Sequence, residues 1–167
     1  MYHLPAVQWV GCSNLVEVFS LFRCHCWLQW SMPKSPRYTR DHAQSGLDAD
    51  FPEIECWPNQ FPGYEITIDD PEFTSVCPKT GLPDFGHLSI RYMPDQKCLE
   101  LKSLKEYLQS YRNLGIFQEN VVNRVLKDIV RWARPVWAEV KGDFRPRGGI
   151  STVVVARWPR QKLRTGN

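Results

Sequence analysis

The sequence predicts an α+β fold, with one four-stranded antiparallel sheet and two helices packed on one of its faces. Three observations support this prediction. Apolar residues alternate in two stretches in the middle of the chain, then recur every three or four residues in two adjacent stretches, and two further β-rich stretches follow. The elements therefore follow one another as strand, strand, helix, helix, strand, strand.

The four predicted strands share the alternation of apolar and polar residues that is typical of a half-buried strand. They cover residues 64–69, 85–93, 136–144 and 150–158. Between the last two, a Pro and two Gly predict a hairpin-like turn. Because the edge strands of so small a sheet would leave backbone groups unpaired, we expect a homo-oligomer with sites between its subunits.

Two consecutive amphipathic helices are predicted between the strand pairs. In the first, Leu101, Leu104 and Leu108 recur at helical spacing. The second carries its apolar residues over 121–130 and ends before Pro135, since proline cannot continue a helix.

Composition limits the classes of protein to consider. A chain of 167 residues with 43% hydrophobic content can bury the core of one globular domain. A net charge of +3 is too small for a protein that binds nucleic acid by charge, and suits a small anionic ligand better. Six cysteines in a chain of this size favour a reduced thiol set over a disulfide framework, so we expect a cytoplasmic protein.

Residues 1–50 are predicted to be an N-terminal extension that is poorly ordered or results from a mis-assigned start, and residues 51–167 to be the domain. The apolar stretch at 4–30 contains polar residues and follows no basic region, so we expect neither a signal peptide nor a membrane span. Residues 31–50 have the composition of a linker. The sequence Cys24-His25-Cys26 lacks a second pair of ligands at zinc-site spacing, so we expect no metal site.

Cys77 is the best candidate for a chemical centre. Pro and Gly residues follow it and would hold a thiol at the end of a strand, and Asp84 lies seven residues later. From the residues alone the alternatives remain open: Cys77 could be an inert buried thiol, and Asp84 a turn cap beside Pro83.

Other candidate residues also have ordinary structural explanations. Glu119 lies in the first turn of the second helix, where the helix dipole favours a carboxylate. Lys102 and Lys105 lie on one face of the first helix and could simply be solvated, and Arg147 could be a loop residue. No glycine-rich dinucleotide motif follows a strand, so a Rossmann cofactor site is not supported.

Four segments resemble the QueF family of NADPH-dependent 7-cyano-7-deazaguanine reductases, in the family's order and spacing. They are residues 77–84, residues 100–107 (Glu-Leu-Lys-Ser-Leu-Lys-Glu-Tyr), residues 117–119 (Phe-Gln-Glu) and residues 144–149 (Phe-Arg-Pro-Arg-Gly-Gly). The resemblance covers about residues 64–158, in the single-module form of the family. It implies a tunnelling fold, whose subunits close into β-barrel rings with active sites at their interfaces.

The resemblance also implies a reaction, the reduction of a nitrile to a primary amine in queuosine biosynthesis, with two NADPH consumed and no metal. Cys77 would add to the nitrile carbon and form a thioimidate, because a nitrile accepts hydride poorly by itself. Asp84 would supply a proton to the nitrogen. To do so near neutral pH it would have to hold a proton, which burial in an interface pocket favours.

Further roles follow from the resemblance. Glu100 and Glu119 would anchor the deazaguanine base. Gln118 stands beside Glu119 where the family often has His, and an amide can hydrogen-bond but cannot exchange a proton.

Three cations are implied to hold the phosphates of NADPH, namely Lys102, Lys105 and Arg147. Gly148 would allow the backbone to approach the cofactor closely. Cys98 could form an accidental disulfide with Cys77, but we expect it to be structural.

Two other functions remain open. One is a cyclohydrolase-like tunnelling-fold enzyme acting on a pterin or purine, which would need a set of metal ligands. The other is a ring protein that binds a ligand without catalysis.

Overall fold

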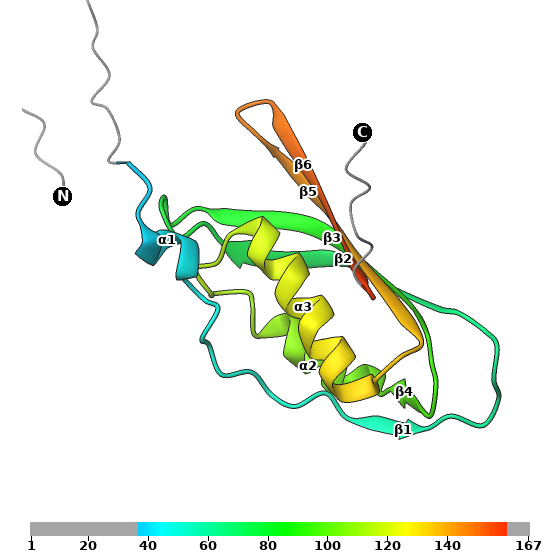
Figure 1. Ribbon diagram of the computed structural model, residues 1–167. Helices are drawn as coiled ribbons and strands as arrows, with labels where there is room; N and C mark the ends of the chain where they lie inside the picture. The colour runs from blue at the N-terminus through cyan, green and yellow to red at the C-terminus, as the bar shows by residue number, and fades with distance from the viewer. Residues whose placement is uncertain (1–36, 160–167) are drawn as a thin grey trace, which may run out of the picture. The chain divides into compact units, whose positions relative to one another are not determined.

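The computed structural model describes residues 37–159. These residues belong to one compact unit. Its main sheet is antiparallel and four-stranded, with the order β2-β3-β5-β6 (Figure 1). These strands are β2 (Ile66–Val76), β3 (Pro83–Met93), β5 (Trp137–Arg147) and β6 (Ile150–Trp158).

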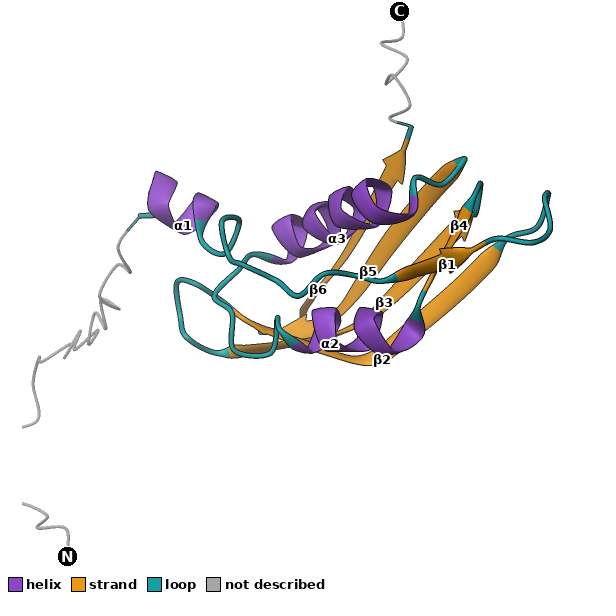
Figure 2. Cartoon of the chain, turned by 90° about the horizontal axis from the view of Figure 1, so that it is seen from below, coloured by secondary structure: helices purple, strands orange, loops and turns teal. Residues whose placement is uncertain are grey.

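Two helices, α2 (Leu101–Gln109) and α3 (Gln118–Ala133), lie on the same face of this sheet (Figures 1 and 2). Each buries an apolar stripe against the sheet, because its apolar residues recur at the helical period. The core that results includes Leu88, Ile90, Leu104, Val125 and Ile129. The predicted α+β class, element order and position of both helices are therefore confirmed.

The predicted end of α3 is also confirmed. The helix stops at Ala133, Arg134 adopts a left-handed conformation with φ of 47°, and Pro135 follows. A left-handed residue followed by proline is a common helix ending.

The hairpin between β5 and β6 is tighter than the sequence predicts. Residues 145–147 belong to β5, and only Gly148 and Gly149 form the turn, with φ of 55° and 84°. Two positive φ angles match a two-residue turn that fits the twist of the strands, and glycine adopts them without strain. Arg147 is therefore a strand residue directly opposite Ile150.

Three elements were not predicted. They are α1 (Arg40–Gln44) and the two strands of a small sheet, β1 (Cys56–Pro58) and β4 (Lys97–Leu99). The strands are too short for a periodic signal. Helix α1 lies within the predicted linker. The proposed division of the chain at residue 50 stays a prediction, and Cys24, His25 and Cys26 lie outside the described residues.

No helix in the part of the chain that the structure describes is both long and apolar enough to cross a membrane.

Close packing between β5 and α3 yields a first prediction. A Cβ atom added at Gly142 would lie 2.7 Å from Val122 Cγ2 and 2.7 Å from Phe144 Cε2. We expect Gly142→Ala to lower the free energy of unfolding by about 1–3 kcal/mol, as overpacking usually does. Urea unfolding measures it, with the exposed neighbour substitution Lys141→Ala as control. An unchanged stability of Gly142→Ala would contradict this packing.

Candidate functional site

Cys77 follows directly after β2 and starts a closed turn. Its N–H donates to the carbonyl of Leu82 at 2.9 Å, and the N–H of Gly81 donates to the carbonyl of Cys77 at 2.9 Å. The residue is only 8% exposed. The turn predicted from the Pro and Gly residues thus holds the thiol at the end of the strand.

The pKa of the Cys77 thiol lies below its ordinary value. Burial is the largest single influence and raises this pKa, because it disfavours the charged thiolate. Four groups stabilise the thiolate and together outweigh burial, namely the hydroxyl of Thr80, the backbone N–H groups of Thr80 and Lys79, and the side chain of Arg147. The turn therefore favours the thiolate, which is the nucleophilic form.

Asp84 is the second residue of β3 and faces the same region. It is directly opposite Ser75 of β2 and is 4% exposed. Its Oδ1 atom lies 2.6 Å from Arg147 Nη2 in an ion pair and accepts a hydrogen bond from Gln118 Nε2 at 2.8 Å. Oδ2 has no hydrogen-bond partner among the described residues. Arg147 and Gln118 therefore hold Oδ1, whereas Oδ2 remains available to a ligand.

Arg147 influences both candidate catalytic residues. Its Nη2 forms the ion pair with Asp84 and donates to the carbonyl of Leu82 at 3.0 Å, and its side chain helps to lower the pKa of Cys77. The resemblance implied a role in holding cofactor phosphate. That role stays a prediction; in this structure the guanidinium is paired with Asp84, because β5 extends through residue 147.

The start of α3 supplies the third side of the site. Gln118 is the first residue of the helix and donates to Asp84, while Glu119 in the same turn is exposed. The Gln118 amide is therefore a hydrogen-bond donor to the Asp84 carboxylate.

Glu100 lies elsewhere and caps α2. Its two carboxylate oxygens accept from the N–H groups of Lys102 at 2.8 Å and Ser103 at 2.7 Å. The backbone N–H groups of Ser103 and Lys102 also hold the pKa of Glu100 below its ordinary value. A carboxylate has about four acceptor sites, so capping does not use all of its capacity.

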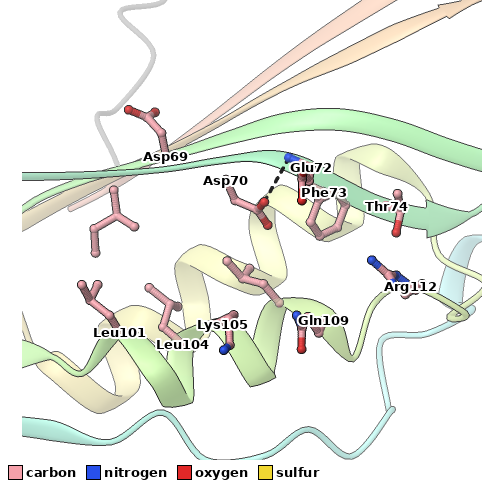
Figure 3. A pocket seen from close by; sticks show the side chains of 12 residues that line it. Asp69, Asp70, Glu72, Phe73, Thr74, Leu101, Leu104, Lys105, Gln109 and Arg112 are labelled. Carbon is pink, nitrogen blue, oxygen red and sulfur yellow. Dashed lines mark hydrogen bonds between the residues drawn. The ribbon is translucent and has the colours of Figure 1, made fainter.

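Lys102 and Lys105 are exposed on α2. Lys105 lines a cavity of about 380 Å³ between α2 and β2, together with Arg112 and the acidic residues Asp70 and Glu72. Figure 3 shows Lys105 and Arg112 on the helix side of this cavity and Asp70 on the strand side. Cys77 and Asp84 do not line it.

The candidate residues therefore form two groups. One group meets at the Val76 end of β2 and consists of Cys77, Asp84, Gln118 and Arg147. Glu119 follows Gln118 in the chain. Glu100 borders a hollow with Ile66 and Ile68, near the opposite end of the same strand. Eight extended residues separate Ile68 from Val76, a span of about 25 Å.

Sequence reasoning missed two residues of the site. Thr80 was treated only as part of the turn, although its hydroxyl lowers the pKa of the Cys77 thiol. Ser75 is fully buried, and its hydroxyl has no hydrogen-bond partner among the described residues, directly across the strand pair from Asp84. A threonine three residues after a candidate nucleophile in a tight turn was the available signal.

Cys98 has a structural setting. It is fully buried in β4, and its sulfur lies 3.3 Å from the hydroxyl of Tyr64. Cys77 and Cys98 are both free thiols. Among residues 37–159 no group of three His, Cys, Asp or Glu side chains is placed to hold a metal ion.

Comparisons with known proteins agree on one family. Residues 83–162 match the family model described as QueF-like protein. The chain is 57% identical over 125 residues to an NADPH-dependent 7-cyano-7-deazaguanine reductase of Elusimicrobium minutum, covering 74% of this chain and 95% of that protein. The chain belongs to this reductase family.

Other matches are consistent with the family. A protein of the same name from Chloroherpeton thalassium is 48% identical over 111 residues, covering 65% of this chain and 96% of that protein. A crystal structure titled archaeosine synthase QueF-Like, in the apo form, has a TM-score of 0.53 at 24% identity, covering 56% of this chain and 91% of that chain. At that identity the likeness supports the fold alone.

The hydrogen bond from Thr80 yields a second prediction. Thr80→Val removes the hydroxyl that lowers the pKa of Cys77, so the pH midpoint of Cys77 alkylation should move upward. Thr80→Ser keeps a hydroxyl and should stay near the wild-type midpoint. Peptide mass spectrometry after iodoacetamide treatment across a pH series isolates Cys77 from the other thiols. Equal midpoints for the valine variant and the wild type would contradict the assignment.

Proposed function

We propose that this chain reduces the nitrile of 7-cyano-7-deazaguanine to a primary amine with two NADPH, as a step of queuosine biosynthesis. One observation carries the proposal. A buried thiol with a lowered pKa and a buried carboxylate share one arginine, in a chain whose relatives bear the name of that reductase. The order of the proton and hydride transfers is left open.

The first step requires a thiolate. The Cys77 sulfur adds to the nitrile carbon, one carbon–nitrogen π bond breaks, and its electron pair moves to nitrogen. Protonation of that nitrogen gives a neutral thioimidate bound to the enzyme. The hydrogen bonds from Thr80 and Arg147 that favour the thiolate support this step.

Asp84 is the proposed proton donor, and it must first take up a proton from solvent because its carboxylate is ion-paired with Arg147. Gln118 and Arg147 both hold Oδ1 and so fix the orientation of the carboxyl group. The Oδ2 atom, which lacks a partner among the described residues, can then face the nitrogen of the substrate. The exposed carboxylate of Glu119, next to Gln118, can accept paired N–H donors from the base.

NADPH supplies a hydride in each of two reductions, so the conversion of nitrile to amine takes up two hydrides and two protons. Between the two reductions the carbon–sulfur bond to Cys77 must break, which regenerates the thiolate. A stabilised thiolate is a good leaving group as well as a good nucleophile.

The proposed cofactor residues fit NADPH in part. Lys102 and Lys105 are exposed cations, three residues apart on one helix, and suit phosphate groups. Gly148 is exposed in the hairpin turn and allows close backbone approach. Arg147 can reach a phosphate only if it gives up or shares Asp84 and Leu82.

A homo-oligomer is proposed because the two groups of residues lie apart. Glu100 borders a hollow with Ile66 and Ile68, and Lys105 lines a separate cavity, and neither hollow includes Cys77 or Asp84. β2 and β6 are edge strands, and each borders a hollow, of about 380 Å³ beside α2 and about 690 Å³ beside α3. A neighbouring subunit paired at these edges would supply α2 to the thiol. Ring assembly, a cytoplasmic location and the lack of a nucleic-acid partner stay predictions.

The thioimidate step is tested by intact mass. Incubation of wild-type protein with 7-cyano-7-deazaguanine, without NADPH, should add the mass of one substrate per chain. Cys77→Ala should form no adduct and show no turnover. Asp84→Asn should still bind the substrate but turn over at least about 100-fold more slowly. Turnover by Cys77→Ala would refute the nucleophile.

A site shared between subunits is tested by complementation. Cys77→Ala and the double variant Lys102→Ala/Lys105→Ala should each be inactive. When the two are co-expressed with different tags and assemble at random, about one quarter of the interfaces pair an intact Cys77 with intact lysines. Mixed oligomers should therefore recover about a quarter of the wild-type activity. Mixed oligomers without any activity would contradict a shared site.

A further inference from the structure

We propose that residues 38–49, here called the arm, belong to the catalytic module and position both the Cys77 turn and the start of α3. The inference concerns positioning and rests on the proposed function only where turnover is measured. It departs from the prediction that the functional domain begins at residue 51. The arm contacts three segments that build the site.

The first contact is with the start of α3. The ring of Tyr38 packs on that of Phe117, with the ring centroids 5.7 Å apart. Phe117 is the N-cap of α3 and directly precedes Gln118, the amide that holds Asp84. One turn further along, Asn120 Nδ2 donates to the carbonyl of Ala43 at 2.8 Å. The arm thus fixes the residues on both sides of Gln118.

The second contact reaches the residue before the thiol. Ser45 Oγ donates to the carbonyl of Gly115 at 2.5 Å. Gly115 forms a parallel bridge with Val76, supported by hydrogen bonds from Val76 N to Leu114 O at 3.0 Å and from Ile116 N to Val76 O at 2.9 Å. Val76 immediately precedes Cys77, so Ser45 is connected through Gly115 to the residue before the thiol.

The arm can approach the backbone of residues 115–116 closely only because position 46 is a glycine. Gly46 has φ of 75°, and a Cβ atom added there would lie 2.8 Å from Ile116 Cβ and 2.9 Å from Gly115 O. The arm therefore packs directly against the 115–116 backbone, and no side chain separates them.

The third contact is with the Cys77 turn itself. Lys79 Nζ lies 3.9 Å from the centroid of the Tyr38 ring, which is a cation–π distance. The backbone N–H of Lys79 is one of the groups that hydrogen-bond to the Cys77 sulfur. Tyr38 therefore contacts the turn at Lys79 and the helix at Phe117 with a single ring.

The far end of the arm is also anchored. Arg124 of α3 donates to the carbonyls of Leu47 and Ala49, the latter at 3.1 Å. Its guanidinium is held by Asp128 Oδ2 at 2.8 Å. The arm is therefore held at both ends, by Tyr38 against α3 and the Cys77 turn and by Arg124 at Leu47 and Ala49.

Similarity to a relative gives independent support. The match to the Elusimicrobium minutum protein covers 74% of this chain, whereas residues 51–167 make up only about 70% of it. The matched region must therefore begin before residue 51 and include part of the arm.

The test compares Tyr38→Ala with Tyr38→Phe in the full chain. Tyr38 is 63% exposed, so its removal leaves the core intact, and phenylalanine keeps the ring that contacts Lys79 and Phe117. For Tyr38→Ala we expect kcat to fall about tenfold with little change in KM, because misplaced catalytic groups slow the chemical step. The pH midpoint of Cys77 alkylation should rise. Tyr38→Phe should match the wild type, and Ser45→Ala should behave like Tyr38→Ala.

The readouts separate failure of this inference from failure of the proposed function. If the wild type turns over but Tyr38→Ala and Ser45→Ala keep its kcat and its alkylation midpoint, the arm does not position the site. If both variants lose thermal stability in proportion to activity while the midpoint stays fixed, the arm is only structural and the inference is wrong. A wild type that fails to reduce the nitrile would overturn the proposed function, whereas a raised midpoint in the two variants would still support the arm.

Discussion

The site depends on the ion pair between Arg147 and Asp84. Its atoms lie 2.6 Å apart, and the aspartate side chain is almost fully buried. A buried ion pair adds little net stability, because desolvation of the charges offsets their attraction, but removal of one partner leaves an unpaired charge and is costly. Further donors to the same groups, from Gln118 to Asp84 and from Arg147 to Leu82, make burial tolerable. The pair thus joins β3, the β5–β6 hairpin and α3 at one point.

The fold determines how the site residues are arranged around this ion pair. β2 delivers Cys77 at its end, the antiparallel return through β3 brings Asp84 back, and the long hairpin places Arg147 between them. The arm and the Gly115 bridge fix the turn from the other side. In the same chain, Glu100 borders a hollow near Ile66 and Ile68, and Lys105 lines a cavity that Cys77 and Asp84 do not reach, which is the basis for proposing an assembly.

The sequence predicted those features that local pattern determines. Alternation and helical spacing predict the strands and helices, and the Pro and Gly residues predict the turn that holds Cys77. Two other features depend on contacts that no periodicity encodes. The position of Arg147 depends on how far β5 extends before the two glycines, and the docking of Tyr38 depends on an aromatic pair 79 positions apart. Glu100 was predicted only as a ligand residue because its capping bonds become visible only once the start of α2 is fixed.

The most direct test of the account is the stoichiometry of the reaction. Freshly reduced wild-type protein is mixed with 7-cyano-7-deazaguanine and NADPH, the loss of nicotinamide absorbance is followed, and the amine product is quantified by mass spectrometry. Two NADPH should be oxidised for each nitrile converted. Failure to oxidise NADPH at any substrate concentration would contradict it.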